Sequence, residues 1–140
     1  MKVSTKWQGD FAFTMDNGQG HILPMDAGKA AGGKGSGVSP MEALLGSLAG
    51  CMGIDIFMIL KPYQEKIERI ELETDGERNE EPPKYFKKIQ VTVNVDGDVP
   101  ASRIFRAVNL SNDKYCSVAN SLKAELSYKV VLNGEEVSQA

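Results

Sequence analysis

Residues 41–60 form a run that is apolar on nearly every side of the helix its spacing predicts. Leucine, isoleucine and methionine recur there at intervals of three and four residues, which is the spacing of a helix face. Ser39 can cap this helix, Pro40 suits its first turn, and Pro62 closes it. Such a helix would be about 30 Å long. Because it lacks a broad polar face, other parts of a protein must cover it on all sides.

Two arrangements could provide that cover. In the first, the same helix of a second copy packs against it across a two-fold axis, and the protein is a homodimer. In the second, helices nearer the C-terminus cover it within one monomer. The chain of 140 residues offers limited cover of its own, but the residues alone leave both arrangements open.

Short strands and a glycine-rich segment precede the long helix. Residues 2–8, 11–15 and 20–25 alternate in polarity and predict three strands joined by tight turns, most simply as a meander. The segment 26–38 contains five glycines and no aromatic residue. We expect it to be a mobile loop that acts as a lid.

Strands and helices also follow the long helix, and their order indicates the fold class. Alternation with a period of two predicts a long hairpin, helical spacing then predicts two helices, and a final strand ends the pattern. This order predicts the α+β class, with an antiparallel sheet packed with the long central helix, in a single domain over 1–140. The predicted ranges are 67–74 and 89–95 for the hairpin strands, 101–110 and 114–126 for the helices, and 126–132 for the last strand.

Composition argues against two classes of partner. The net charge is −3 and the lysines are scattered, whereas binding to nucleic acid needs a concentrated basic face. No eighteen consecutive residues are apolar, and the N-terminal residues are polar and strand-like, so we predict neither a membrane span nor a signal peptide. We therefore expect a cytoplasmic protein, in which cysteines are more often free thiols than structural disulfides.

The chain has two cysteines, Cys51 and Cys116, in different settings. Gly50 and Gly53 flank Cys51 in the apolar helix and leave space beside its sulfur. Cys116 is expected at the start of the last helix, where the helix dipole and Lys114 would favour a thiolate. An isolated buried cysteine is more often a structural core residue, but the two cysteines together indicate redox chemistry.

A metal site is not expected from the sequence. The cysteines lack the C-x-x-C spacing of zinc sites, and the chain has one histidine, His21. Neither a nucleophile elbow nor a phosphate-binding glycine motif is present. The sequence therefore predicts no cofactor.

Two segments resemble the OsmC/Ohr family. The first is S-P-M-E-A-L-L-G-S-L-A-G-C over residues 39–51, and the second is K-Y-C-S-V-A-N-S-L-K-A-E-L over residues 114–126. The resemblance covers essentially the whole chain and is nearest to the OsmC-like, YhfA-type branch. It implies an intertwined α+β homodimer with two active sites at the subunit interface.

The same resemblance implies an activity, which is the reduction of organic hydroperoxides by the cysteine pair. Cys51 would be the peroxidatic thiol, oxidised to a sulfenic acid, and Cys116 the resolving thiol that forms a disulfide with it. A small dithiol or lipoyl-type donor would then restore both thiols.

Three further residues are candidates for supporting the thiols. In the family a glutamate directly follows the proline, and an arginine comes from the preceding loop. Here Glu42 stands one position later than that glutamate, about half a turn round the helix from Cys51. The loop before the helix has lysines, among them Lys34, and no arginine. Asp55 lies one helical turn beyond Cys51 on the same face.

These departures from the family pattern leave other functions open. The protein could bind an apolar or acyl ligand in the same interface pocket without catalysis. It could also be a redox-responsive dimer without turnover. Hydroperoxide reduction is favoured because it uses both cysteines.

Overall fold

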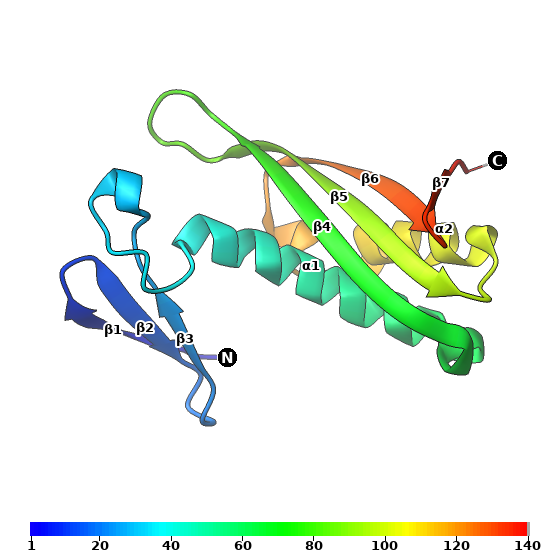
Figure 1. Cartoon of the computed structure of the whole chain (residues 1–140), viewed down its shortest axis with the longest axis horizontal. Helices are drawn as coiled ribbons and strands as arrows, with labels where there is room; N and C mark the ends of the chain where they lie inside the picture. Colours follow the sequence, from blue (N-terminus) through cyan, green and yellow to red (C-terminus); the bar gives the residue numbers. More distant parts are fainter. Residues whose placement is uncertain (140) are drawn as a thin grey trace. The chain divides into compact units, whose positions relative to one another are not determined.

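The computed structural model describes residues 1–139 and divides into two compact units, Met1–Leu44 and Leu45–Ala140. Figure 1 shows the elements of both units. The expectation that 1–140 is a single domain stays a prediction.

The first unit contains the predicted meander. Strands β1 (Ser4–Gly9), β2 (Ala12–Asp16) and β3 (Ile22–Met25) pair antiparallel in the order β1-β2-β3. The tight turn between β1 and β2 places Gly9 and Asp10 at positive φ, a conformation that glycine and aspartate tolerate best. The prediction of three short antiparallel strands is confirmed.

The glycine-rich segment after β3 is more ordered than its composition predicts. It contains a short 3₁₀ helix, η1 (Lys29–Ala31), and is organised around the buried side chain of Asp26. The Asp26 carboxylate accepts hydrogen bonds from the Ser36 N–H at 3.0 Å, the Ser36 hydroxyl at 2.8 Å and the Lys34 N–H at 3.2 Å. These bonds, above all those from Ser36, lower the pKa of Asp26. The loop is therefore tied to one aspartate, a restraint that glycine content alone does not reveal.

The long helix is present as α1 (Pro40–Ile59) and begins with a capping box. The Ser39 hydroxyl accepts from the Glu42 N–H at 3.1 Å, and the Glu42 carboxylate accepts from the Ser39 N–H at 3.0 Å. By length and mean hydropathy, 1.6 over its most apolar stretch, α1 could cross a membrane, as core helices of globular proteins also could. Only 17% of that stretch is buried within the chain, so most of this apolar helix lacks cover from its own residues.

The second unit is built on a four-stranded sheet with the order β4-β5-β6-β7. The antiparallel prediction is wrong for one pair, because β5 and β6 run parallel. The chain leaves the end of β5, passes through helix α2, and returns to start β6 in the same direction, which is the crossover that a parallel pair needs. Figure 1 shows α1 and α2 on the same face of the sheet. The elements are η2 (Lys61–Lys66), β4 (Ile67–Arg78), β5 (Phe86–Gly97), α2 (Ala101–Leu110), β6 (Glu125–Leu132) and β7 (Glu135–Val137).

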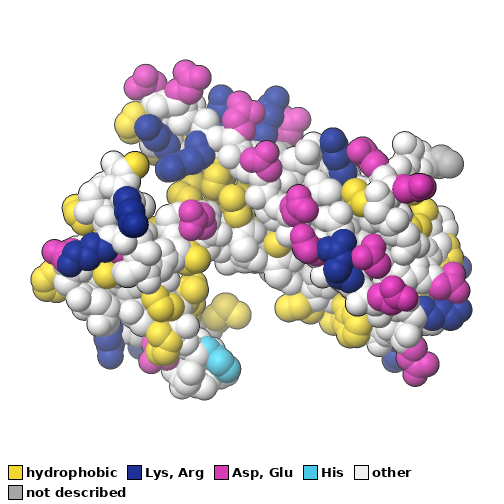
Figure 2. All heavy atoms as spheres, viewed as in Figure 1, with side chains coloured by type: hydrophobic (Ala, Val, Ile, Leu, Met, Phe, Trp, Pro, Cys, Tyr) yellow, Lys and Arg dark blue, Asp and Glu magenta, His cyan; other side chains and the backbone are white. Residues whose placement is uncertain are grey.

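The core of this unit lies between the sheet and the helices. Alternate residues of β5 are buried, as are one face of α1 and one face of α2, which is the pattern of a sheet covered on one side. The opposite face carries charges, seen over the sheet in Figure 2, including an ion pair from Arg69 to Asp96 at 2.8 Å. The α+β prediction is confirmed. The buried residues are Ile89, Val91, Val93 and Val95 of β5, Leu48, Met52 and Ile56 of α1, and Ile104, Ala107 and Val108 of α2.

The helix predicted over 114–126 is absent. Instead α2 continues into one π-helical turn, η3 (Ser111–Tyr115), and Cys116 follows with extended backbone angles. A short 3₁₀ helix, η4 (Ala119–Ser121), then leads toward β6. Cys116 therefore lies between two short turns, not at the start of an α-helix.

One glycine of β4 is required by the packing. A Cβ at Gly76 would clash with the buried Phe86 ring and lie 3.2 Å from Cδ2 of Leu45. We expect Gly76→Ala to lower the free energy of unfolding by about 1–3 kcal/mol through overpacking, measured as a denaturant midpoint at fixed protein concentration. Gly28→Ala is the control, because Gly28 has φ −63 and open space around its Cβ position. Equal stability of Gly76→Ala and the unmodified protein would contradict this packing.

Candidate functional site

Both cysteines and one carboxylate meet in the second unit. The sulfurs of Cys51 and Cys116 and a carboxylate oxygen of Asp55 all lie within 4.8 Å of one another. Cys51 and Asp55 belong to α1, whereas Cys116 comes from the turn after α2. The fold thus brings together three of the five residues singled out from the sequence.

Helix geometry explains why Cys51 and Asp55 lie close together. Residues four apart on an α-helix lie on one face, so α1 presents Cys51 and Asp55 on the same side. Small residues surround the thiol: a Cβ at Gly53 would lie 3.6 Å from Leu72 of β4, and one at Gly50 would meet nothing within 4 Å. The Cys51 side chain is half-buried. The Cys51 side chain is therefore partly accessible to solvent.

The turn that carries Cys116 is fixed by hydrogen bonds. Its N–H donates to the Ser111 carbonyl at 2.7 Å and closes the π turn. The Asn120 side-chain amide donates to the Cys116 carbonyl at 2.8 Å. The Cys116 sulfur itself accepts from the Ala119 N–H at 3.3 Å. Its side chain is fully buried, so this thiol is held in place and screened from solvent.

The electrostatics of Cys116 differ from the sequence prediction. Burial raises the pKa of Cys116 to about 11, against the weaker lowering effect of the Ala119 N–H. A hydrogen bond with the Cys51 thiol and the charges of Cys51 and Asp55 contribute smaller parts of this rise in the pKa. Lys114 does not offset this; its ammonium lies 5.2 Å from the centre of the Tyr115 ring. The predicted low-pKa thiolate at Cys116 is wrong, because the expected helix N-terminus is absent and the sulfur is buried.

Polar residues that the sequence analysis missed surround this group. The buried Ser111 hydroxyl donates to Oδ2 of Asp55 at 2.8 Å and orients the carboxylate. The Tyr128 hydroxyl of β6 donates to Oδ1 of Asn112 at 2.6 Å. Burial and the nearby Cys116 raise the pKa of Tyr128 to about 12. No spacing in the sequence links these residues to the cysteines, since only the fold brings them close.

The other two predicted supporting residues have partners of their own in the first unit. Glu42 takes part in the capping box of α1. Lys34 is exposed and forms an ion pair with Asp10 at 2.9 Å.

An open apolar hollow lies between α1 and β4, and it is lined by sequence neighbours of Cys51 and not by Cys51 itself. It has a volume of about 560 Å³ and includes Gly50 and Gly53 on either side of the cysteine. Its remaining lining residues are Ala49, Ile54, Phe57, Met58, Ile70 and Leu72. All of these residues are uncharged, so this surface of α1 suits an alkyl or aryl group.

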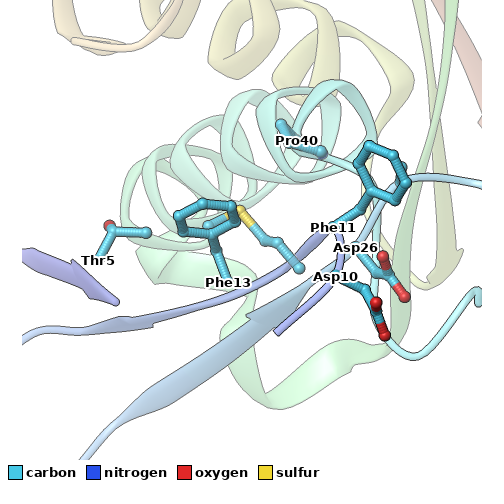
Figure 3. Close-up of a pocket in the computed structure, with 8 residues that line it drawn as sticks. Thr5, Asp10, Phe11, Phe13, Asp26 and Pro40 are labelled. Atoms are coloured by element: carbon cyan, nitrogen blue, oxygen red, sulfur yellow. The ribbon is translucent and has the colours of Figure 1, made fainter. Parts of the chain in front are cut away.

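A second apolar hollow belongs to the first unit and contains no cysteine. It has a volume of about 460 Å³. Figure 3 shows Phe11, Phe13 and Pro40 around it, with the carboxylates of Asp10 and Asp26 on one side. Phe11 and Phe13 are both exposed in the single chain.

Comparisons with known proteins agree with this arrangement. Residues 33–131 match the family model described as OsmC-like protein, a range that includes both cysteines. The chain is 35% identical to Protein YhfA of Escherichia coli over 136 residues, covering 94% of this chain and 98% of that protein.

Solved structures share the fold. A crystal structure of a hypothetical protein from Aquifex aeolicus aligns with a TM-score of 0.78 and 27% identity, covering 94% of this chain and 96% of that one. An organic hydroperoxide resistance protein OsmC from Legionella pneumophila aligns with a TM-score of 0.64 and 15% identity, covering 94% and 96%. At that identity the second comparison concerns the fold alone. By its sequence and its fold, this chain belongs to the OsmC-like protein family.

Proposed function

We propose that this protein reduces organic hydroperoxides with Cys51 and Cys116. The observation that supports this most is the approach of the two sulfurs to within 4.8 Å, although they come from distant parts of the chain. A disulfide has an S–S bond of about 2.05 Å, so side-chain rotation and a small movement of the Cys116 turn would be needed to form it. The fold shared with an organic hydroperoxide resistance protein is consistent with the same chemistry.

The difference in burial assigns the two roles. Cys51 is half-buried, whereas Cys116 is fully buried. A peroxide arriving from solvent therefore meets Cys51 first. Cys51 is the peroxidatic thiol in this proposal and Cys116 the resolving thiol.

The reaction then has three steps. The Cys51 thiolate attacks the terminal peroxide oxygen, the O–O bond breaks, and the alkoxide leaves as an alcohol after taking up a proton, which leaves a sulfenic acid on Cys51. The Cys116 sulfur attacks the Cys51 sulfur, a disulfide forms, and water leaves. A small dithiol or lipoyl-type donor then reduces the disulfide by exchange and becomes a disulfide itself.

The surface of α1 supports a homodimer. Ile54 and Met58 are 65% and 63% exposed in the single chain, and Phe57 is 46% exposed. Contiguous apolar side chains of this kind are usually covered by a partner. A second copy of the chain packed over α1 would cover them and would enclose the open hollow that Gly50 and Gly53 line.

Steady-state turnover tests this function directly. The reduced protein should consume cumene hydroperoxide when dihydrolipoamide is supplied, and more slowly consume hydrogen peroxide, which has no apolar group to bind in the hollow. The measurement is peroxide remaining over time, with dihydrolipoamide alone as the blank. Consumption no faster than the blank for every peroxide would contradict the proposal and would favour a binding function.

A further inference from the structure

The cluster of Cys51, Asp55 and Cys116 offers chemistry that requires no peroxide. Two sulfurs and one carboxylate oxygen converge from two segments. We propose that the reduced protein binds one thiophilic divalent cation, Zn²⁺, through the Cys51 sulfur, the Cys116 sulfur and a carboxylate oxygen of Asp55. This proposal rests on the geometry of the cluster and not on the peroxidase activity.

The distances are close to those of a tetrahedral zinc site. Zinc binds thiolate sulfur at about 2.3 Å and carboxylate oxygen at about 2.0 Å, which in a tetrahedron places two sulfurs about 3.8 Å apart and sulfur and oxygen about 3.5 Å apart. All three candidate donor atoms are within 4.8 Å of one another. Side-chain rotations that move each atom by about 1 Å or less would complete the arrangement.

Two of the three proposed ligands, Asp55 and Cys116, already accept hydrogen bonds of the kind that orient ligands in metal sites. The Ser111 hydroxyl donates to Oδ2 of Asp55 at 2.8 Å and holds the carboxylate in place. The Ala119 N–H donates to the Cys116 sulfur, and such a bond stabilises negative charge on a metal-bound thiolate. Outer contacts of this kind orient ligands and strengthen metal binding. Cys51 and Asp55 are four residues apart on α1, so the helix fixes their spacing.

The donor types select the cation. Two sulfurs and one oxygen suit zinc or cadmium, whereas calcium and magnesium require shells made mostly of oxygen. Three protein ligands leave the fourth position for water, and Cys51 is only half-buried, so the cluster is not sealed from solvent on its side. The two thiols release their protons to solvent as they bind, so two thiolates and a carboxylate would surround the divalent ion.

Metal binding and disulfide formation exclude each other at this cluster. Both processes use the same two sulfurs, and a disulfide sulfur is no longer a thiolate ligand. Bound zinc would therefore protect the thiols from oxidation, and oxidation would release zinc. No motif in the sequence predicts this metal site, because Cys116 is far from Cys51 and Asp55 in the sequence and the fold brings the three together.

Zinc binding to the reduced, full-length protein tests the inference. Increasing protein should remove Zn²⁺ from a chromogenic chelator with a stoichiometry of one ion per chain. Asp55→Asn keeps the side-chain shape and should weaken binding at least about tenfold, since it replaces a charged ligand by a neutral amide. Asp98→Asn is the matched control, because Asp98 is exposed and pairs with Lys66 at 3.7 Å on another part of the chain. Its affinity should equal that of the unmodified protein.

Cadmium provides a second readout, because thiolate-to-cadmium charge transfer absorbs in the ultraviolet and reports sulfur ligation. The reduced protein should develop this absorption, and Cys116→Ser should lose about half of it. Absence of one-to-one zinc binding, or equal affinity in Asp55→Asn and Asp98→Asn, would overturn the proposal. Neither result depends on hydroperoxide turnover, so failure of the proposed function would leave this test intact.

Discussion

Replacing Cys51 by serine should abolish hydroperoxide turnover. A serine hydroxyl is not ionised near neutral pH and is a far weaker nucleophile toward peroxide than a thiolate, so the rate with cumene hydroperoxide should fall roughly 10³-fold or more. Cys51 is half-buried, and serine differs from cysteine by one atom. We therefore do not expect misfolding to account for the loss of turnover. The measurement is steady-state peroxide consumption with dihydrolipoamide, together with a circular dichroism spectrum to confirm the fold.

The Cys116→Ser variant tests whether Cys116 is the resolving thiol. Without the resolving thiol, Cys51 should still react once with peroxide and remain as a sulfenic acid, which dimedone traps as a mass adduct. Turnover with the dithiol should fall, whereas the first oxidation should keep its rate. Undiminished turnover in Cys51→Ser, or failure of Cys116→Ser to yield the adduct, would contradict the assigned roles.

Introducing a charge at Ile54 should break the proposed homodimer. Ile54 is 65% exposed in the single chain and lines the apolar hollow on α1. In a two-fold dimer packed over α1, Ile54→Glu would bury a carboxylate in each subunit, and an unpaired buried charge costs about 3–5 kcal/mol. Light scattering after size exclusion should give twice 15.2 kDa for the unmodified protein and 15.2 kDa, or aggregate, for the variant.

Ser102→Glu is the control for this substitution. Ser102 is exposed in the first turn of α2, where an acidic residue is compatible with the helix dipole. This variant should keep the mass of the unmodified protein. An Ile54→Glu protein that remains a dimer at the same concentration would show that α1 is not the interface.

Local sequence pattern predicted much of the fold. The spacing of apolar residues identified α1, and the alternation of β4 and β5 identified the long hairpin, because burial on one face imposes these periods. The spacing of Cys51 and Asp55 on one helix face was equally visible. These features depend on residues close in sequence.

The helix expected over 114–126 shows where this reasoning fails. Val118, Leu122 and Leu126 recur at four-residue intervals and are partly buried, which suggested a helix. The Asn120 side chain instead donates to the Cys116 carbonyl, and the Ser121 hydroxyl donates to the Ser117 carbonyl at 2.8 Å. Side chains of these types offer the backbone hydrogen bonds outside a helix. The four-residue spacing of Val118, Leu122 and Leu126 therefore arises because separate segments each place one apolar side chain in a partly buried position, and not because they form one helix.

The environment of the site depended on the tertiary fold. Full burial of Cys116 cannot be inferred from neighbouring residues, and it reverses the direction expected for its pKa. Ser111 reaches Asp55 across more than fifty positions in the sequence. The parallel pairing of β5 and β6 was also not predictable from the strand patterns, because the same alternation suits either direction.

The most direct test of the central claim is the fate of the two thiols after one equivalent of an organic hydroperoxide. The fully reduced protein would be mixed with cumene hydroperoxide, quenched with a thiol-alkylating reagent within seconds, and analysed by mass spectrometry. We expect loss of both free thiols, loss of two hydrogen atoms from the chain, and a peptide pair joined between Cys51 and Cys116. Two alkylated thiols remaining after minutes would contradict the claim that this pair reduces hydroperoxides.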